Sequence, residues 1–343
     1  MHEQSKALAE RNIIRLKIKY SRLNVSFLFP NLQSSIFNLL IVFCLCLCLS
    51  ACCQPKPVNI QPFPVASSPI AANHINTIEN FYQPAGIAFD YDGNIYVADS
   101  GNSKIQLIDK DYRKIVAIGC FGWKVGEFDH PMDVAFSNLM MYIADSGNNR
   151  IQRYGLADRI FGVIAGEKSN KSENSLELYS PQGIATDLRG DVYIVDTWDN
   201  RILKTDLLGN ILLEIGGLNR FNKPQGVMVD KTGNIYVCDT GNNRVCKLDF
   251  SGIQTTCWGS EGDGKGQFQT PTSISQDKNG NLYVVDQGNK RIQAFNPDRA
   301  YLGEFGQDEL KEPYDIAIDN ENHAYVTDMS SSNVEVYKII PPK

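Results

Sequence analysis

The chain has 343 residues, of which 43% are hydrophobic and 21% charged, a composition that can bury a core and argues against intrinsic disorder. Its formal net charge is −6. Residues 1–51 hold six Lys or Arg and two Glu, a net +4, so the remainder carries −10. An acidic body lacks the electrostatic attraction on which nucleic-acid binding depends, and we therefore expect no nucleic-acid partner.

An apolar run of fourteen residues occupies positions 36–49. It is too short for a comfortable membrane span of about 20 residues and is typical of the hydrophobic region of a secretory signal. The sequence LSAC at residues 49–52 follows and resembles a bacterial lipobox. That resemblance implies a signal peptide over 1–51 and lipidation of Cys52. An ordinary signal cleaved after Ala51 and an uncleaved anchor are the alternatives.

Five prolines and no strand pattern mark the segment that follows the lipobox. Because prolines favour an extended conformation, residues 52–72 are predicted to form a semi-rigid tether, with a folded domain over 73–343. Some bacterial lipoproteins carry an inner-membrane retention aspartate at the position of Cys53. The lipobox resemblance therefore implies the bacterial envelope, and the outer membrane rather than the inner one.

The folded domain repeats one pattern six times, and residues 226–248 show it most clearly. Two β-patterned runs, Val227–Asp230 and Ile235–Asp239, flank a turn in which Gly233 supplies the positive φ that a tight hairpin needs. A third run, Arg244–Leu248, follows a second turn. The second strand of each copy ends on an aspartate: Asp99, Asp145, Asp196, Asp239, Asp286 and Asp328.

These aspartates are 46, 51, 43, 47 and 42 residues apart, and a fourth strand ending on glycine completes most copies. Such a period with four strands per copy is typical of propeller blades. We therefore predict an all-β fold, a six-bladed β-propeller of four-stranded antiparallel blades. The last copy lacks a fourth strand, so an N-terminal strand at about 75–78 is predicted to pair beside Val334–Ile339 and close the ring.

The turn after the second strand reads DSGNSK, DSGNNR, DTWDNR, DTGNNR and DQGNKR in the first five copies. Together with P-x-G-[IV]-A and GNIYVAD, these turns resemble the NHL-repeat family of six-bladed β-propellers over about residues 81–340. Members of that family serve as protein-binding, RNA-binding, sensor and enzyme modules. The resemblance therefore implies the fold without choosing a function.

Each of these five turns places an acid and a base five residues apart, where a hairpin makes them opposite partners. We predict that the pairs hold the turns as exposed ion pairs worth about 0–1 kcal/mol each, rather than gripping an acidic ligand. In the sixth copy, Asn333 replaces the base. The five pairs are Asp99 with Lys104, Asp145 with Arg150, Asp196 with Arg201, Asp239 with Arg244, and Asp286 with Arg291.

A ligand site is expected where the copies differ on one face. The loops before the first strand and the turns after the second strand open on the same side of a propeller, and the first strands line its channel. Asp133 and Asp315 replace the glycine of P-x-G in copies two and six. With His130, Tyr314 and Trp198 they form the predicted ligand pocket, and solvated loop residues are the alternative.

The histidines argue against the zinc-dependent chemistry of some NHL-like lyases. His74, His130 and His323 are predicted on two different faces, so they cannot share one ion at about 2.0–2.1 Å. No G-x-S-x-G elbow supports a serine nucleophile. We therefore assign no catalytic residue, no metal and no cofactor. A divalent cation near Asp133 and Asp315, serving a lyase or lactonase, is left open.

Three cysteines, Cys238, Cys246 and Cys257, fall in the fourth copy. If residues 250–253 form a hairpin, Cys246 and Cys257 lie opposite each other on neighbouring strands. An oxidising periplasm permits a disulfide between them, and two buried thiols are the alternative.

The sequence as a whole predicts a lipid-anchored, monomeric propeller that binds an envelope protein, a peptide or a small ligand on one face. The first alternative is a metal-dependent lyase or lactonase at the mouth of the channel. The second alternative is an RNA-binding NHL module, which export and the charge of −10 disfavour.

Overall fold

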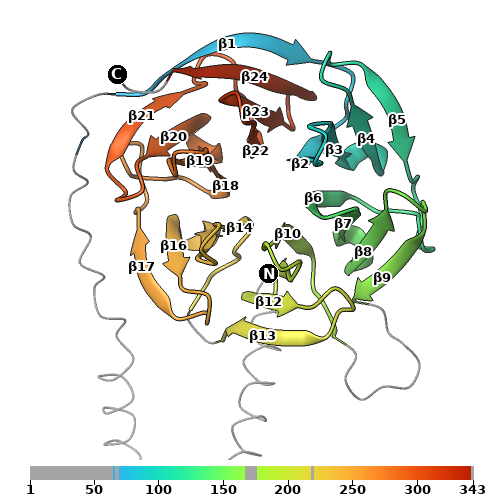
Figure 1. The fold of residues 1–343 in the computed structure, drawn as a ribbon. Coiled ribbons are helices and arrows are strands. Elements are labelled where there is room, and N and C mark those ends of the chain that lie inside the picture. Colours follow the sequence, from blue (N-terminus) through green and yellow to red (C-terminus); the bar gives the residue numbers. More distant parts are fainter. Residues whose placement is uncertain (1–64, 66–68, 167–175, 218–219, 341–343) are drawn as a thin grey trace, which may run out of the picture. The chain divides into compact units, whose positions relative to one another are not determined.

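The computed structural model describes residues 65, 69–166, 176–217 and 220–340. The described residues form six four-stranded antiparallel sheets, arranged as blades around a central axis (Figure 1). The predicted all-β, six-bladed propeller is therefore confirmed. The signal peptide predicted over 1–51, the lipidation of Cys52 and most of the tether predicted over 52–72 lie outside the described residues.

The first three blades follow one another along the chain. Blade 1 contains β2 (Pro84–Phe89), β3 (Ile95–Asp99), β4 (Lys104–Ile108) and β5 (Lys114–Ile118). Blade 2 contains β6 (Pro131–Ser137), β7 (Met140–Asp145), β8 (Arg150–Gly155) and β9 (Phe161–Ala165). Blade 3 contains β10 (Pro181–Thr186), β11 (Val192–Asp196), β12 (Arg201–Thr205) and β13 (Ile211–Gly216).

The other three blades complete the ring. Blade 4 contains β14 (Val227–Val229), β15 (Ile235–Asp239), β16 (Arg244–Leu248) and β17 (Gln254–Trp258). Blade 5 contains β18 (Pro271–Gln276), β19 (Leu282–Asp286), β20 (Arg291–Phe295) and β21 (Tyr301–Phe305). Blade 6 contains β22 (Pro313–Ile318), β23 (His323–Asp328), β24 (Asn333–Ile340) and β1 (Ala71–Ile78).

Helical structure among the described residues includes four short 3₁₀ turns between second and third strands. They are η2 (Ser100–Asn102), η3 (Ser146–Asn148), η4 (Thr240–Asn242) and η5 (Gln287–Asn289). None of the helices in the described ranges has the length and hydropathy of a membrane-spanning segment.

Because the strands of a blade alternate in direction, its turns divide between two faces. The face that we call the loop face carries the loops joining one blade to the next and the turns at residues 100–103, 146–149, 197–200, 240–243, 287–290 and 329–332. The opposite face, which we call the hairpin face, carries the turns between first and second strands and the hairpins between third and fourth strands. Those hairpins span residues 109–113, 156–160, 206–210, 249–253 and 296–300.

The aspartate that ends each second strand is fully buried and joins three parts of its blade. In blade 2, the Asp145 carboxylate accepts hydrogen bonds from the Asp129 N–H at 2.8 Å, from Arg150 Nε at 2.7 Å and from Gln152 Nε2 at 2.9 Å. The first bond fixes the loop before the first strand, and the others fix the third strand. The expectation of exposed ion pairs is therefore wrong, because the aspartates lie in the interior.

The five predicted acid–base pairs are all present. In blade 6, where Asn333 replaces the base, Asp328 accepts backbone N–H bonds from Lys311, Glu312 and Ser331. The paired atoms are 3.9 Å apart in Asp99–Lys104, 2.7 Å in Asp145–Arg150, 2.8 Å in Asp196–Arg201, 2.7 Å in Asp239–Arg244 and 2.8 Å in Asp286–Arg291.

The ring closes as predicted, with β1 antiparallel to β24 on the rim of blade 6 (Figure 1). Pairing runs from Ala71 opposite Ile340 to Ile78 opposite Val334, longer than the predicted strand because β24 itself has eight residues. The buried Glu335 carboxylate secures the seam. His74 Nε2 and Thr77 Oγ1 each lie 2.6 Å from it.

Six apolar clusters, each shared by two neighbouring blades, make up the described core. Ile78 of the closing strand belongs to the cluster between blades 6 and 1, with Tyr325 from one and Val97 from the other. Closure therefore buries apolar surface as well as pairing an edge, and burying apolar surface is the larger source of stability.

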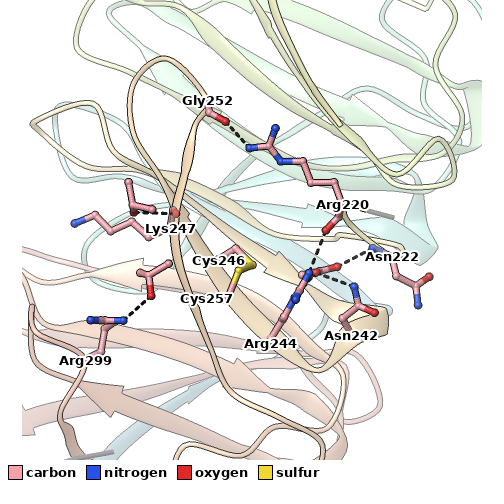
Figure 2. Close-up of a disulfide and its surroundings, with 12 residues drawn as sticks. Arg220, Asn222, Asn242, Arg244, Cys246, Lys247, Gly252, Cys257 and Arg299 are labelled. Atoms are coloured by element: carbon pink, nitrogen blue, oxygen red, sulfur yellow. Dashed lines mark hydrogen bonds and ion pairs between the residues drawn. A yellow bond between two sulfur atoms is a disulfide. The ribbon is translucent and has the colours of Figure 1, made fainter. Parts of the chain in front are cut away.

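A disulfide joins Cys246 of β16 to Cys257 of β17, as one of the two sequence interpretations predicted. The two residues are directly opposite in the register of these neighbouring strands, with Cα atoms 4.0 Å apart. Arg244 and Asn242 lie close by, at the end of β16 nearest the loop face (Figure 2).

Replacing Arg150 by Ala should lower the free energy of unfolding by about 3–5 kcal/mol, because it leaves the buried Asp145 carboxylate without its cation. Arg150 also donates to the carbonyls of Trp123, Lys124 and Glu127. Urea unfolding measures the change. The matched control is Lys104→Ala, which removes a longer and more exposed partner and should cost about 0–1 kcal/mol. An equal loss of unfolding free energy in both variants would contradict the importance of the buried Asp145–Arg150 pair.

Replacing Ile78 by Asp should destabilise the propeller by on the order of 4 kcal/mol, since it puts a charge into the apolar seam between blades 6 and 1. Ile75→Asp is the control, because Ile75 lies at a bulge of the same strand and is 48% exposed. Thermal unfolding and light scattering compare the two. A closing strand that does not support the ring would give both variants the melting temperature of the wild type.

Candidate functional site

The channel of the propeller holds a cavity of about 300 Å³. Its walls come from the six innermost strands, β2, β6, β10, β14, β18 and β22, which ring the centre of the disc (Figure 1). Toward the loop face the wall is polar and includes Gln182, Gln225 and Thr272. Toward the hairpin face it is mainly apolar and includes Phe136 and Ile318.

Tyr314 crosses the channel at its polar end. Its hydroxyl lies 3.4 Å from Oε1 of Gln182, which belongs to the opposite blade, and its side chain is buried. Burial, followed by the nearby Asp133 and Asp315 carboxylates, raises the pKa of Tyr314 well above its usual value, so the hydroxyl keeps its proton and can donate it. The contact narrows the channel on the side of the loop face.

Asp133 and Asp315 bond to the blade that follows each of them in the ring. Asp133 Oδ2 accepts the N–H of Ile184 at 2.8 Å, and Asp315 Oδ2 accepts the N–H of Ile87 at 2.7 Å. The second oxygen of Asp315 accepts the N–H of Ile316 at 2.7 Å and the hydroxyl of Ser273. Both carboxyls therefore fasten neighbouring first strands to each other.

The glycines of P-x-G lie where the first strands of neighbouring blades come close together. Ile184 follows Gly183, and Ile87 follows Gly86, so in both cases the bonded amide lies next to a residue without a side chain. A Cβ on Gly86 would lie 2.4 Å from Oδ1 of Asp133, and one on Gly183 would lie 2.2 Å from a backbone oxygen of blade 4. Around the ring this position is Gly86, Asp133, Gly183, Gly226, Ser273 and Asp315, so three blades carry a side chain there and three do not.

Burial raises the pKa of both carboxyls. The pKa of Asp133 rises well above its usual value, first through burial and then through the nearby Asp315 carboxylate, while N–H bonds from Ile184 and Val134 oppose the rise. The pKa of Asp315 rises to about 6, also through burial, against the opposing bonds from Ser273 and Ile87. Two carboxyls in one channel thus favour holding a proton between them near neutral pH.

The structure brings together three of the five predicted site residues. Asp133, Tyr314 and Asp315 line the channel cavity, and His130 and Trp198 do not. His130 is exposed on the loop face with Nδ1 2.6 Å from Asp129. Trp198 also stands on that face, 58% exposed. The sequence correctly placed all five toward one side, but the channel and the outer face are separate surfaces.

The channel carboxyls are poor metal ligands. Each of their four oxygens already accepts a hydrogen bond from the protein, and the strongly raised pKa of Asp133 favours its neutral form. Across the described residues, no group of three or more His, Cys, Asp or Glu is placed to hold a metal ion. These contacts do not support the divalent cation left open above, which stays a prediction.

The histidines of the described domain lie beside separate carboxylates. His74 contacts Glu335, His130 contacts Asp129, and His323 contacts Asp319. His323 is the first residue of β23. We therefore derive no catalytic step from them.

Replacing Asp315 by Asn should change how stability depends on pH. A carboxyl whose pKa is raised on folding stabilises the protein below its unfolded value near pH 4, and that contribution is lost as the pH rises toward about 6. The free energy of unfolding of the variant, relative to wild type, should therefore rise between pH 4 and pH 7. Asp298→Asn, at an exposed position, is the control. A difference that stays constant with pH would contradict the raised pKa.

Parts of the chain are similar to known proteins. The NHL repeat family matches residues 81–106, 221–248 and 268–295. Protein brain tumor from Drosophila melanogaster is 28% identical over 142 residues, and protein SUPPRESSOR OF QUENCHING 1, chloroplastic, from Arabidopsis thaliana is 28% identical over 159 residues. Each alignment covers 40% of this chain, but only 12% and 15% of those two proteins.

Solved structures resemble the chain over a longer stretch. Virginiamycin B lyase from Staphylococcus aureus has a TM-score of 0.57 and 17% identity, over 79% of this chain and all of that one. Identity at this level shows the fold alone. The chain therefore carries NHL repeats in the three matched segments, and its described residues fold as a six-bladed β-propeller.

Proposed function

We propose that this propeller is an envelope-anchored binding module that holds a protein or peptide partner on its loop face. The observation that carries the proposal is Trp198. In four other blades the equivalent residue is a glycine, Gly101, Gly147, Gly241 or Gly288.

A glycine is needed there because the preceding loop passes close by. A Cβ on Gly147 would lie 2.5 Å from the Asp129 side chain, and one on Gly241 would lie 2.7 Å from the Asn222 carbonyl. In blade 3 the turn lacks the 3₁₀ segment of those four blades. The Trp198 N–H keeps the repeat's bond to the preceding loop, at 3.2 Å from the Tyr179 carbonyl, whereas the Gly147 N–H lies 2.8 Å from the Asp129 carbonyl. The local backbone has thus departed from the repeat around a large side chain that the fold does not bury.

The surroundings of Trp198 suit a binding site. Lys223 Nζ lies 4.8 Å from the centre of its ring, and Tyr179 beside it is 56% exposed. Tryptophan and tyrosine are enriched among the residues that carry most of the energy of protein interfaces. An ammonium over an aromatic face adds a cation that an acidic or aromatic group of a partner can approach.

The anchor part of the proposal rests on the sequence alone. The apolar run at 36–49 and the LSAC sequence support export and lipidation of Cys52, with the propeller monomeric and held by its proline-rich tether at the outer membrane. Export would place the propeller in an oxidising compartment, where disulfides form. The Cys246–Cys257 bond is consistent with that location.

Replacing Trp198 by Gly, the residue of the other blades, tests the binding face. Partner recovery from solubilised envelopes should fall about 30-fold, the effect of losing an interface residue worth about 2 kcal/mol. The melting temperature should stay close to that of wild type, because the substitution restores the repeat. Phe250→Ser on the hairpin face is the matched control and should keep the partner. Unchanged recovery by Trp198→Gly would remove this face from the proposal.

A further inference from the structure

Exposed apolar side chains gather at the tips of the turns on the hairpin face. They occupy both kinds of turn, those between first and second strands and those between third and fourth strands. All are between 62% and 81% exposed: Tyr91, Leu139, Ile160, Leu188, Leu208 and Phe250.

These tips cover one sector of the face. They belong to blades 1 to 4, and two blades contribute a pair each, Leu139 with Ile160 and Leu188 with Leu208. Neighbouring turns touch, since the Leu156 N–H bonds to the Leu139 carbonyl. The corresponding turns of blades 5 and 6 have Lys278, Asp298 and Glu321 at their tips. Blades 1 and 4 each have one apolar tip and one turn with a charged tip, Lys110 or Lys231. The apolar tips therefore concentrate in blades 2 and 3, a difference between repeats that the stability of the fold does not require.

Basic residues stand directly beside the apolar tips. Arg159 precedes Ile160, Arg189 follows Leu188, and all these side chains are exposed. The first aspartate of these turns instead points inward: Asp187 Oδ1 accepts the N–H groups of Arg189 and Asp191, and Asp206 does the same in the next hairpin. Exposed acids also stand in these turns, but exposed basic residues outnumber them, although the domain as a whole is acidic. The acids are Asp92, Asp111 and Asp158, and the basic residues are Lys110, Arg113, Arg159, Arg189 and Lys231.

The N-terminal part of the chain joins the propeller on this same face. Ala71, the first residue of β1, is opposite Ile340, and the neighbouring Ile339 N–H bonds to the Asn322 carbonyl in a turn of the hairpin face. Just before it, the Ile70 N–H bonds to the Leu302 carbonyl of blade 5. Ile70 and Ala71 therefore lie at the hairpin face beside blades 5 and 6, across the disc from the apolar tips of blades 2 and 3.

We propose that the hairpin face docks on an anionic lipid bilayer, with the apolar tips of blades 1 to 4 inserted among the headgroups and the tether as a second point of attachment. A tether alone leaves a disc free to rotate. A second contact on the far side of the same face fixes the disc flat on the membrane and turns the loop face outward. Exposed loops with Leu, Ile, Phe or Tyr beside Arg have the composition of interfacial segments.

Tryptophan fluorescence of the full chain tests this arrangement. The three native tryptophans are Trp123 and Trp198, which stand on the loop face, and Trp258, which is buried. The full chain is reconstituted with vesicles of phosphatidylglycerol and phosphatidylcholine that carry brominated acyl chains, which quench only nearby tryptophans. The variant Leu188→Trp places a reporter on the docking face, and Tyr179→Trp places the matched reporter on the loop face.

Leu188→Trp should show a blue shift and a loss of emission on these vesicles, and wild type and Tyr179→Trp should not. The loss should shrink when Arg159 and Arg189 are both replaced by Gln, or when phosphatidylglycerol is omitted. Association with vesicles but no quenching at residue 188 would overturn the docking and leave the anchor standing. No association would overturn both. Self-association without lipid that Leu188→Ser abolishes would assign the face to a second copy and overturn the proposal.

Discussion

A buried carboxylate at the end of each second strand is the constraint on which the propeller depends. An ionised aspartate removed from water is costly unless every lone pair finds a donor. The chain supplies the donors from the loop before the first strand, from an asparagine of the turn and, in most blades, from a cation on the third strand. Satisfying one charge therefore fixes three segments, and six such charges fix the loop face.

The position seven residues after each aspartate shows how the repeat is adapted. In blades 1, 2 and 5 it is a glutamine, Gln106, Gln152 or Gln293, that donates to the carboxylate. In blade 4 it is Cys246, which forms the disulfide instead. In blade 6 it is Glu335, which contacts His74 and Thr77 of the closing strand. In blades 4 and 6, whose carboxylates have other donors, this position instead forms a disulfide or holds the closing strand.

Strand order, blade number and ring closure followed from the sequence because each depends on spacing along the chain. Spacing also placed Cys246 opposite Cys257, but it did not decide between a disulfide and two free thiols. The burial of Asp145 and its equivalents did not follow, because an acid beside a base in a polar turn reads as surface, and its donors come from a loop sixteen residues away. The site was divided for a similar reason. Asp133 and Trp198 lie toward the same face, but Asp133 lines the channel and Trp198 stands on an outer turn. Only the folded path of the backbone shows that these are separate surfaces.

The channel does not bring the two faces into one site. The Tyr314–Gln182 contact spans it near the loop face, and the Asp133 and Asp315 carboxyls below are bonded to neighbouring strands. If these carboxyls bound a ligand, they would give up their hydrogen bonds to neighbouring first strands, and the ring would be less stable. Blade-specific residues that the fold does not use, Trp198 on one face and Leu188 on the other, are therefore better evidence of function than the polar residues of the centre.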